Sequence, residues 1–466
     1  MSRYLMIDFG STFTKLTAVD TQTEDIIATA NSFTTVATDI TIGYQNALEE
    51  LYKKIGNKIS FDKIIGCSSA AGGLKMAAIG LVEELTLEAA KRVCLGAGAK
   101  VELAFSHHLT DSDVQRIIDS KIDIILLAGG TDGGNTECVL FNQMKLAESS
   151  IKIPVIYAGN KNCADEIRAI AQEYGMNEYV CGNVMPRLNE LKVDEARDKI
   201  REIFLKNIIE AKGIKKIEKA IDKVILPTPE AVLRAAELLS KGFMHERGLG
   251  EIILVDIGGA TTDFYSMSSA SAKRSDVILK GLQEPYAKRT VEGDLGMRYS
   301  ALGVLSSLSE EEIRIYNEDE GVDLKKELLF RHEHVDCIPS NVHEEKIDRI
   351  MGQICVDKST ERHVGKMEEM YTPMGLVYYQ FGKDLSQIRY VIGTGGVLVR
   401  SKNPTEILKK VEYSLGKPLE LRPQHPQYLL DKDYILAAMG LLSEIDPLLA
   451  LRIMKKHITE IQPQIN

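Results

Sequence analysis

The spacing of apolar positions changes several times near the start of the chain. Tyr4–Phe9, Phe13–Asp20 and Asp25–Thr34 are short runs rich in apolar and β-branched residues, and the turns between them predict an antiparallel meander. Ile40–Ile55 carries apolar residues at helical spacing, and Lys63–Cys67 is again a short apolar run. We therefore expect the order strand, strand, strand, helix, strand.

The middle of the chain alternates between patterns of buried strands and amphipathic helices. The expected strands are Lys100–Phe105, Ile122–Ala128, Pro154–Ala158 and Glu178–Cys181. The expected helices are Leu85–Leu95, Asp111–Ser120, Asn162–Tyr174 and Asn189–Ala211. Such alternation is typical of a parallel sheet, so we predict an inserted α/β domain.

The last part of the chain mixes strand pairs with polar, partly helical stretches. Glu251–Asp256 predicts a strand with TTDFYSM as its partner, and Glu361–Phe381 predicts a long helix. Ile388–Arg400 predicts a strand, a glycine turn and the start of a helix, and Asp433–Leu442 predicts a closing helix. We expect four parts: a first lobe (1–75 and 221–250), the inserted domain (76–220), a second lobe (251–430), and a closing helix with a tail (431–466).

Composition narrows the classes of function. The chain has 466 residues, 44% of them apolar, which suits about three domains at roughly 150 residues each. Lys and Arg number 57 against 67 Asp and Glu, and the net charge of -10 disfavours a nucleic-acid partner. We expect no membrane helix, because no apolar run approaches roughly 18 residues, and no signal peptide. Scattered cysteines without a Cys-x-x-Cys pair favour reduced thiols and a cytoplasmic protein.

Two short segments repeat one motif. DFGST, from Asp8, and DIGGATTD, from Asp256, each place an aspartate at the end of an apolar strand, before glycines and hydroxyl residues. Glycine permits a sharp turn whose backbone N–H groups face a phosphate, and a carboxylate suits a metal ion that bridges phosphates. The expected phosphate-binding residues are Gly10, Ser11, Thr12, Lys15, Gly258, Gly259, Thr261 and Thr262. The pair predicts a clamp on a nucleoside triphosphate, whereas either turn alone is equally well a hairpin with a polar tip.

Two further glycine turns are candidate ligand sites. In IGTGGVLV, Gly393, Gly395 and Gly396 would let the backbone approach a flat or phosphorylated ligand closely, although such turns are often structural. In LLAGGTDGGN, Asp132 lies between two glycine pairs at the carboxyl end of an expected strand, where ligands of α/β sheets tend to bind. Asp132 is a candidate contact for a metal, a nucleotide or a partner's loop, or else part of a structural turn.

Three other features of the sequence each have a structural and a functional interpretation. A histidine-rich stretch contains residue types that bind zinc, but its spacing matches no common zinc pattern. Its members are His332, His334, Cys337 and His343. The segment Val193–Ile217 is dense in Lys and Glu, which predicts a solvated helix face or, alternatively, a surface that docks a partner. We expect Cys67, Cys94 and Cys138 to be small core residues.

Together these motifs resemble the superfamily of actin, sugar kinases and heat-shock chaperone ATPases. The two Asp-Gly turns resemble its phosphate motifs, GTGGV its adenosine motif, LPTPEAV its first connecting segment and DYILAAMG its last crossing helix. The resemblance implies a two-lobed α/β actin-like ATPase fold, here with an inserted parallel α/β domain, that holds ATP and Mg²⁺ in a cleft. Asp8, Asp256 and Asp132 are the expected metal contacts.

A closer resemblance is to the glutamate mutase accessory proteins, the MutL or GlmL family. It is carried by DFGSTFTK, GCSSAAGGLKM, LLAGGTDGGN, DIGGATTDF, EGDLGMR and GTGGVL, within residues 8–398. The family implies an ATP-dependent, chaperone-like reactivating factor that exchanges damaged cobalamin for intact cofactor. Its implied client is an adenosylcobalamin-dependent mutase, either glutamate mutase or a lysine or ornithine aminomutase. A homodimer or a small accessory subunit would complete the set of partners.

One position departs from the superfamily pattern. The chaperones carry an acid before the Pro-Thr of the connecting segment, where this chain has Leu226. Glu230, one helical turn further on, is the expected substitute for positioning the attacking water. The expected catalytic set is therefore Asp8, Asp256 and Glu230. Two alternatives stay open: a small-molecule kinase of the same superfamily and an actin-like scaffold.

Overall fold

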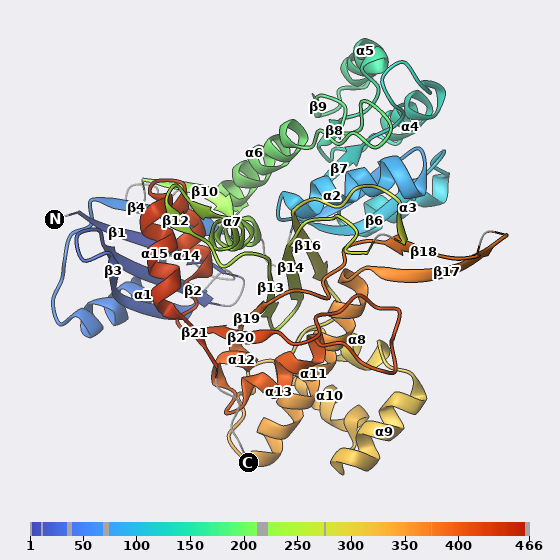
Figure 1. Cartoon of the computed structure of the whole chain (residues 1–466). Helices are drawn as coiled ribbons and strands as arrows, with labels where there is room; N and C mark the ends of the chain where they lie inside the picture. The colour runs from blue at the N-terminus through green and yellow to red at the C-terminus, as the bar shows by residue number, and fades with distance from the viewer. Residues whose placement is uncertain are drawn as a thin grey trace. The chain divides into compact units, whose positions relative to one another are not determined.

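The computed structural model describes residues 2–10, 13–34, 40–68, 74–211, 222–274, 276–373 and 375–461, with the backbone alone for 207–211, 223–225 and 372. The chain divides into two units (Figure 1). Unit 1 comprises Met1–Val232, Gly281–Gln283 and Gly440–Ile445. Unit 2 comprises Leu233–Lys280, Glu284–Met439 and Asp446–Asn466.

The first sheet of unit 1 has five strands in the order β10-β4-β1-β2-β3. Their bounds are β1 (Arg3–Phe9), β2 (Phe13–Asp20), β3 (Asp25–Phe33), β4 (Lys63–Ser68) and β10 (Lys223–Pro227). β1, β2 and β3 form an antiparallel meander, β4 runs parallel to β1, and β10 runs parallel to β4. α1 (Ile40–Ile55) packs on β2 and β3 through a buried face that includes Ala47 and Leu51. The predicted order of the first five elements is confirmed.

The second sheet of unit 1 is entirely parallel, with the strand order β6-β5-β7-β8-β9. Its strands are β5 (Lys75–Gly80), β6 (Lys100–Ser106), β7 (Ile124–Leu127), β8 (Val155–Tyr157) and β9 (Glu178–Val180). Its helices are α2 (Glu88–Gly96), α3 (Asp111–Asp119), α4 (Glu137–Glu148) and α5 (Ala164–Tyr174). The predicted parallel sheet is confirmed. The sequence did not predict α4, because the polar residues Asn142 and Gln143 are buried on its inner face and interrupt the helical spacing of apolar residues.

The main sheet of unit 2 repeats the topology of the first sheet. Its order is β16-β14-β13-β19-β20-β21. The strands are β13 (Ile252–Ile257), β14 (Thr262–Met267), β16 (Ala287–Glu292), β19 (Tyr390–Thr394), β20 (Gln427–Asp431) and β21 (Ile458–Glu460). β13, β14 and β16 form an antiparallel meander, while β19 runs parallel to β13 and β20 runs parallel to β19. β13 thus takes the place of β1, and the predicted α/β class with two related lobes is confirmed.

The second half of the chain also carries helices. They are α8 (Ala301–Ser306), α9 (Glu310–Glu320), α10 (Leu324–Glu333), α11 (Val342–His363), α12 (Gly396–Arg400), α13 (Pro404–Leu408), α14 (Leu436–Ser443) and α15 (Pro447–His457). All belong to unit 2 except the second half of α14, which belongs to unit 1. α11 packs on β13 and β14, and its Ile347 and Ile354 share a core with Val255 and Phe264. α7 (Thr228–Lys241) passes from unit 1 into unit 2.

The predicted long helix over Glu361–Phe381 is wrong. α11 ends at His363, and the chain continues as a hairpin of β17 (Lys366–Thr372) and β18 (Gly375–Phe381), with β15 (Val277–Lys280) beside β18. Gly365 lies against the backbone, since an added Cβ would come within 2.6 Å of the Lys383 carbonyl oxygen. Gly365 and the β-favouring residues of VYYQF therefore end the helix and favour strands, although the helical spacing of apolar residues continues beyond α11.

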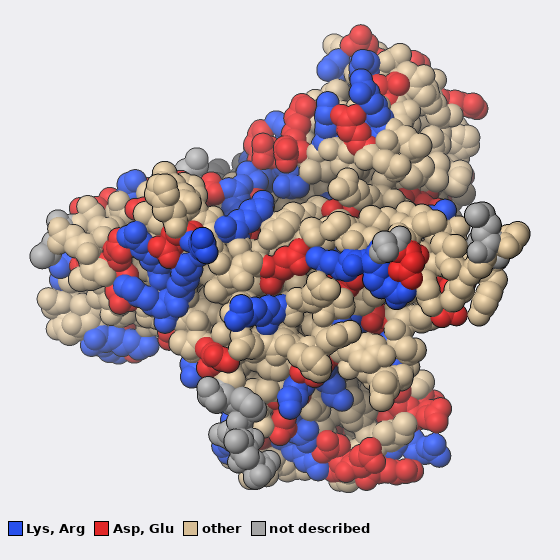
Figure 2. All heavy atoms as spheres, viewed as in Figure 1, with Lys and Arg blue, Asp and Glu red and all other residues tan. Residues whose placement is uncertain are grey.

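Charged side chains of both signs are interspersed on the face shown in Figure 2. Across the described ranges, no helix combines the length and the apolar character needed to cross a membrane. The division of the chain into four parts, with a separate closing helix, stays a prediction.

Candidate functional site

The two Asp-Gly segments share the same backbone hydrogen bond. In the first, the Gly10 N–H donates to the Phe13 carbonyl oxygen at 3.1 Å, and in the second the Gly258 N–H donates to Thr261 at 2.9 Å. A Cβ at Gly10 would lie 2.5 Å from the Phe13 oxygen, and one at Gly258 would lie 3.1 Å from the Thr261 oxygen. The close approach excludes a Cβ at Gly10, whereas at Gly258 it leaves room only for a tight contact.

The Asp8 carboxylate is held in one orientation at the end of β1. Its side chain is 6% exposed, and its Oδ1 accepts a hydrogen bond from the Thr228 hydroxyl at 2.6 Å. Lys15, directly opposite on β2, places its Nζ 3.8 Å from Oδ2. Burial and the neighbouring Asp8 raise the pKa of the Cys67 thiol well above its usual value. A hard carboxylate oxygen beside a lysine fits a phosphate-bound Mg²⁺ ion, so the residues present suit the expected cofactor.

The second turn has different charges around its aspartate. Asp256 is the penultimate residue of β13 and lies opposite Asp263 on β14. Asp263 accepts hydrogen bonds from Arg289, whose Nε and Nη2 lie 2.8 Å and 2.6 Å from Oδ1. The position that Lys15 holds in the first turn is thus occupied here by an acid paired with an arginine.

The predicted hydroxyl contacts fall into separate environments. Thr261 stays in the turn, where its hydroxyl donates to Asp263 at 3.3 Å, and a Cβ at Gly259 would be in ordinary contact with Tyr299. Thr262 is fully buried, and its hydroxyl donates to the Leu295 carbonyl oxygen at 2.8 Å. Thr262 therefore has a packing role in this structure. Ser11 and Thr12 lie outside the described residues.

The third glycine turn follows β19 and opens α12, as the sequence predicts. A Cβ at Gly393 would come within 2.9 Å of Leu398 and Leu408, so this glycine is explained by core packing. Gly395 has a φ of +102°, and its Cβ would lie 2.3 Å from the Ile257 carbonyl oxygen. For Gly396, no described atom lies within 4 Å of the Cβ position. Only Gly396 thus lacks a packing reason to be glycine.

Glu230 lies in the first turn of α7, two residues after Thr228. Its side chain is 3% exposed and is bonded by the Arg201 guanidinium, with Nε donating to Oε2 at 2.8 Å and Nη2 donating to Oε1. Arg201 belongs to α6 (Asp194–Ala211), and the sequence gives no sign that it is a partner. The role of Glu230 toward an attacking water stays a prediction.

Asp132 ties together three loops at the carboxyl edge of the parallel sheet. Its Oδ1 accepts from the Lys161 N–H at 3.0 Å and from the Asn183 amide at 2.9 Å. Asn160, fully buried, accepts from the Gly133 N–H at 3.1 Å. These hydrogen bonds explain the Asp132 loop as a structural element. Over the described ranges, no three His, Cys, Asp or Glu side chains are grouped to hold a metal ion, and the metal role of Asp132 stays a prediction.

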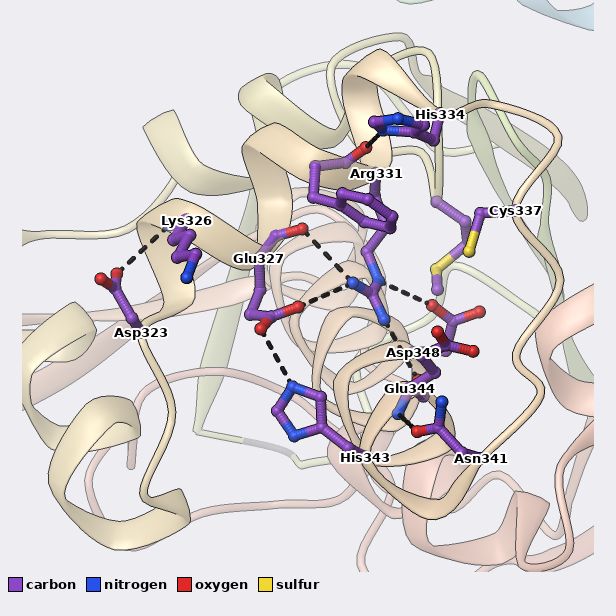
Figure 3. A network of polar contacts seen from close by, with 12 residues as sticks. Asp323, Lys326, Glu327, Arg331, His334, Cys337, Asn341, His343, Glu344 and Asp348 are labelled. Carbon is purple, nitrogen blue, oxygen red and sulfur yellow. Dashed lines mark hydrogen bonds and ion pairs between the residues drawn. The ribbon is translucent and has the colours of Figure 1, made fainter.

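The histidine-rich stretch surrounds a buried arginine (Figure 3). Arg331 is 1% exposed and donates to Asp348 at 3.1 Å and to Glu327 at 2.9 Å. His343 contacts the same Glu327 at 2.9 Å, whereas His334 bonds back to its own helix. His334, Cys337 and His343 point in different directions in Figure 3, so the geometry favours a structural network over zinc.

The structure brings together some of the predicted residues and adds others. Asp8 and Lys15 meet across the first hairpin, and Thr228 joins them from α7. Thr228 is the Thr of the Pro-Thr-Pro segment, so its position after a strand was a usable signal. Cys67, Cys94 and Cys138 are buried, which confirms the prediction that they are core residues.

Comparison with solved structures finds only remote likenesses. Xylulose kinase from Lactobacillus acidophilus has 9% identity over 99% of this chain and 93% of its own, with a TM-score of 0.35. Ethanolamine utilization protein EutJ from Carboxydothermus hydrogenoformans has 12% identity over 97% of this chain and 90% of its own, with a TM-score of 0.28. At these TM-scores the likenesses do not bear on function.

Comparison with sequences is decisive for the family. The model of the family described as MutL protein matches residues 4–458. Protein MutL from Clostridium tetanomorphum is 51% identical over 462 residues, which cover 99% of this chain and 100% of that protein. The chain therefore belongs to the MutL protein family.

Proposed function

We propose that this protein is an ATP-dependent reactivating factor for an adenosylcobalamin-dependent mutase. It would exchange damaged cobalamin for intact cofactor in glutamate mutase or in a lysine or ornithine aminomutase. The observation that carries the proposal is the repeated turn: an aspartate before the same glycine turn, on the same strand of two sheets with the same topology. Membership of the MutL family and the resemblance of its motifs to accessory proteins of glutamate mutase support the choice of client.

In this proposal the aspartates, glycines and lysine of the turns have roles toward ATP. Asp8 and Asp256 would hold Mg²⁺, which would neutralise the charge on the phosphates when it is bound. Gly10 and Gly258 would let the backbone of each turn approach the phosphates, and Lys15 would add a cation beside Asp8. Glu230 orients the attacking water, which requires its carboxylate to loosen from Arg201. Such a requirement favours slow basal hydrolysis.

The proposed mechanism is a shift between conformations. ATP and ADP would favour different conformations of the protein, and the mutase would bind them with different affinities, because a ligand shifts an equilibrium only by its differential affinity. A coupling free energy of ~1–3 kcal/mol would change affinity for the mutase about 5–150-fold. A second copy or a small accessory subunit would complete the active assembly.

A reactivation assay tests the proposal. A candidate mutase loaded with cobalamin that lacks the adenosyl group is incubated with this protein, ATP, Mg²⁺ and fresh adenosylcobalamin. We expect activity to return, and we expect no recovery without ATP or with Asp256→Ala. If all three mutases stay inactive while a metabolite becomes phosphorylated, the protein is instead a small-molecule kinase. If neither occurs and ATP is not hydrolysed, the ATPase assignment fails.

A further inference from the structure

The first turn of α7 contacts both the first sheet and the inserted domain of unit 1. Thr228 opens the helix and donates to Asp8 of β1 at 2.6 Å. Two residues later, Glu230 is bonded to Arg201 of α6. One helical turn therefore carries a contact to the candidate phosphate turn and a contact to a helix of the inserted domain.

The contact with Arg201 is buried at Glu230 and half-buried at Arg201. The side chain of Arg201 is 19% exposed and that of Glu230 is 3% exposed. Two donors of one guanidinium meet two oxygens of one carboxylate, a bidentate geometry that fixes distance and direction together. Arg201 also lies 3.1 Å from Asp198 of its own helix, which orients its head group.

The helix that carries Arg201 packs on elements of the inserted domain and on the first sheet. α6 packs against α2 and β8 and also against β10. Its buried residues Ile200 and Phe204 belong to one apolar cluster with Val93 of α2 and Ile156 of β8, and this cluster extends to β1. A displacement of this part of the inserted domain would therefore move Arg201 with it, since packed helices shift as rigid elements.

A second contact joins the same turn to the inserted domain. Gly98, in the loop between α2 and β6, has a φ of +84°. A Cβ at this position would lie 3.1 Å from Pro227 and 3.5 Å from the Glu230 backbone nitrogen. The loop thus lies directly against the junction of β10 and α7. The inserted domain holds this turn at two points, Arg201 and Gly98.

We infer that Arg201 is a positioning residue that, through Glu230 and the first turn of α7, couples the Asp8 phosphate turn to the inserted domain. The inference rests on the proposed function for the role of Asp8 and adds its regulation. A partner that moves α6 changes the turn that orients Asp8, and a nucleotide at Asp8 changes α6. Such coupling is reciprocal for binding affinities.

The first arm of the test needs no nucleotide. Amide hydrogen exchange of the full chain is compared for wild type, Arg201→Gln, Arg201→Lys and a control, Lys199→Gln, which breaks a surface pair on the same helix. We expect Arg201→Gln to raise exchange at residues 232–236 of α7 by at least about fivefold, because opening of the helix becomes easier. Arg201→Lys should restore part of the protection. Exchange in Arg201→Gln equal to that of the control would overturn the inference.

The second arm adds Mg²⁺ with ADP or a non-hydrolysable ATP analogue. In wild type we expect the two nucleotides to give different exchange in α6, residues 194–206, and in the loop around Gly98. This difference should vanish in Arg201→Gln and persist in Lys199→Gln. A persistent difference in Arg201→Gln would refute the coupling. If wild type binds neither nucleotide, the proposed function fails, and the first arm alone decides whether Arg201 positions α7.

Discussion

At the scale of single residues, two neighbouring glycines have different reasons to be glycine. Gly395 has a left-handed φ of +102° and packs against the Ile257 carbonyl oxygen, which a Cβ would approach to 2.3 Å. Gly396 is the first residue of α12, and no described atom lies near its Cβ position. The sequence alone suggests a nucleoside contact for both, whereas the structure separates a backbone requirement from a candidate ligand contact.

We predict that Gly395→Ala destabilises the protein and that Gly396→Val weakens nucleotide binding without loss of stability. The first change should lower the free energy of unfolding by about 2 kcal/mol or more, because of the strained φ and the clash. The second should weaken ATP about tenfold, or ~1.4 kcal/mol, because a branched side chain fills the space of the ligand. Denaturant unfolding and calorimetry measure the two effects. Equal ATP affinity for a folded Gly396→Val would remove this turn from the nucleotide site.

Sequence patterns fail at the residue scale for partners that are far apart along the chain. Arg201 pairs with the buried Glu230, yet Arg201 belongs to a segment dense in Lys and Glu that resembles a solvated face. Arg331 is 1% exposed among three acidic or carbonyl partners, although the residues that follow it in sequence are polar. Charge alone predicts exposure, and only the fold shows which charges are paired.

At the scale of elements, local pattern predicts strands well where turn residues bound them. β2 and α1 have the predicted bounds, and the hairpin of β13 and β14 follows the predicted pairing. Prediction fails where a helical pattern and a strand pattern adjoin in the sequence. This happens at β17 and β18, which follow directly after α11. It also fails for α4, whose inner face buries polar side chains.

The buried polar side chains of α4 lead to a prediction of how the stability of the protein depends on pH. Burial raises the pKa of Glu178, on β9, from its usual 4.5 to about 7, while a hydrogen bond from Gln143 of α4 opposes the shift. Glu178 Oε1 and Gln143 Oε1 are buried without a hydrogen-bond partner among the described residues. Burial disfavours the charged carboxylate, so the folded state favours the neutral acid.

The direction of this pH effect follows from the linkage between protonation and folding. A raised folded-state pKa gives stability that is complete below about pH 4.5 and is lost as the pH rises through about 7. We expect the loss to be about 2 kcal/mol, since Glu178 is partly exposed. Glu178→Gln should remove this component, so that its free energy of unfolding exceeds that of wild type at pH 8 but not at pH 4.5. Glu173→Gln, on the exposed face of α5, is the control. Parallel pH profiles for wild type and Glu178→Gln would contradict the assignment.

At the scale of the whole molecule, one arrangement of strands occurs twice, and each copy presents an aspartate at the same place. From the residues, only the pair of Asp-Gly turns was predicted to repeat, and the resemblance to the actin and sugar kinase superfamily implied the two related lobes. The repeated strand order itself was not predicted, because other elements separate β14, β16 and β19 along the chain. Lys15 was predicted beside the first turn, but the charges around the second turn were not. Lys15 faces Asp8, but Asp263 with Arg289 faces Asp256, so the two copies have diverged in their electrostatics.

The repeat predicts how two substitutions combine. If both turns serve one step of ATP turnover, Asp8→Ala and Asp256→Ala should each reduce Mg²⁺-dependent hydrolysis at least about 100-fold, or ~2.7 kcal/mol. The double variant should lose little more, because residues that act as a unit have strongly non-additive effects. Circular dichroism must show a folded protein, and Asp165→Ala, at a fully exposed side chain, controls for loss of charge. Losses that multiply would mean that the turns act independently, and a folded double variant with unchanged turnover would show that neither aspartate takes part.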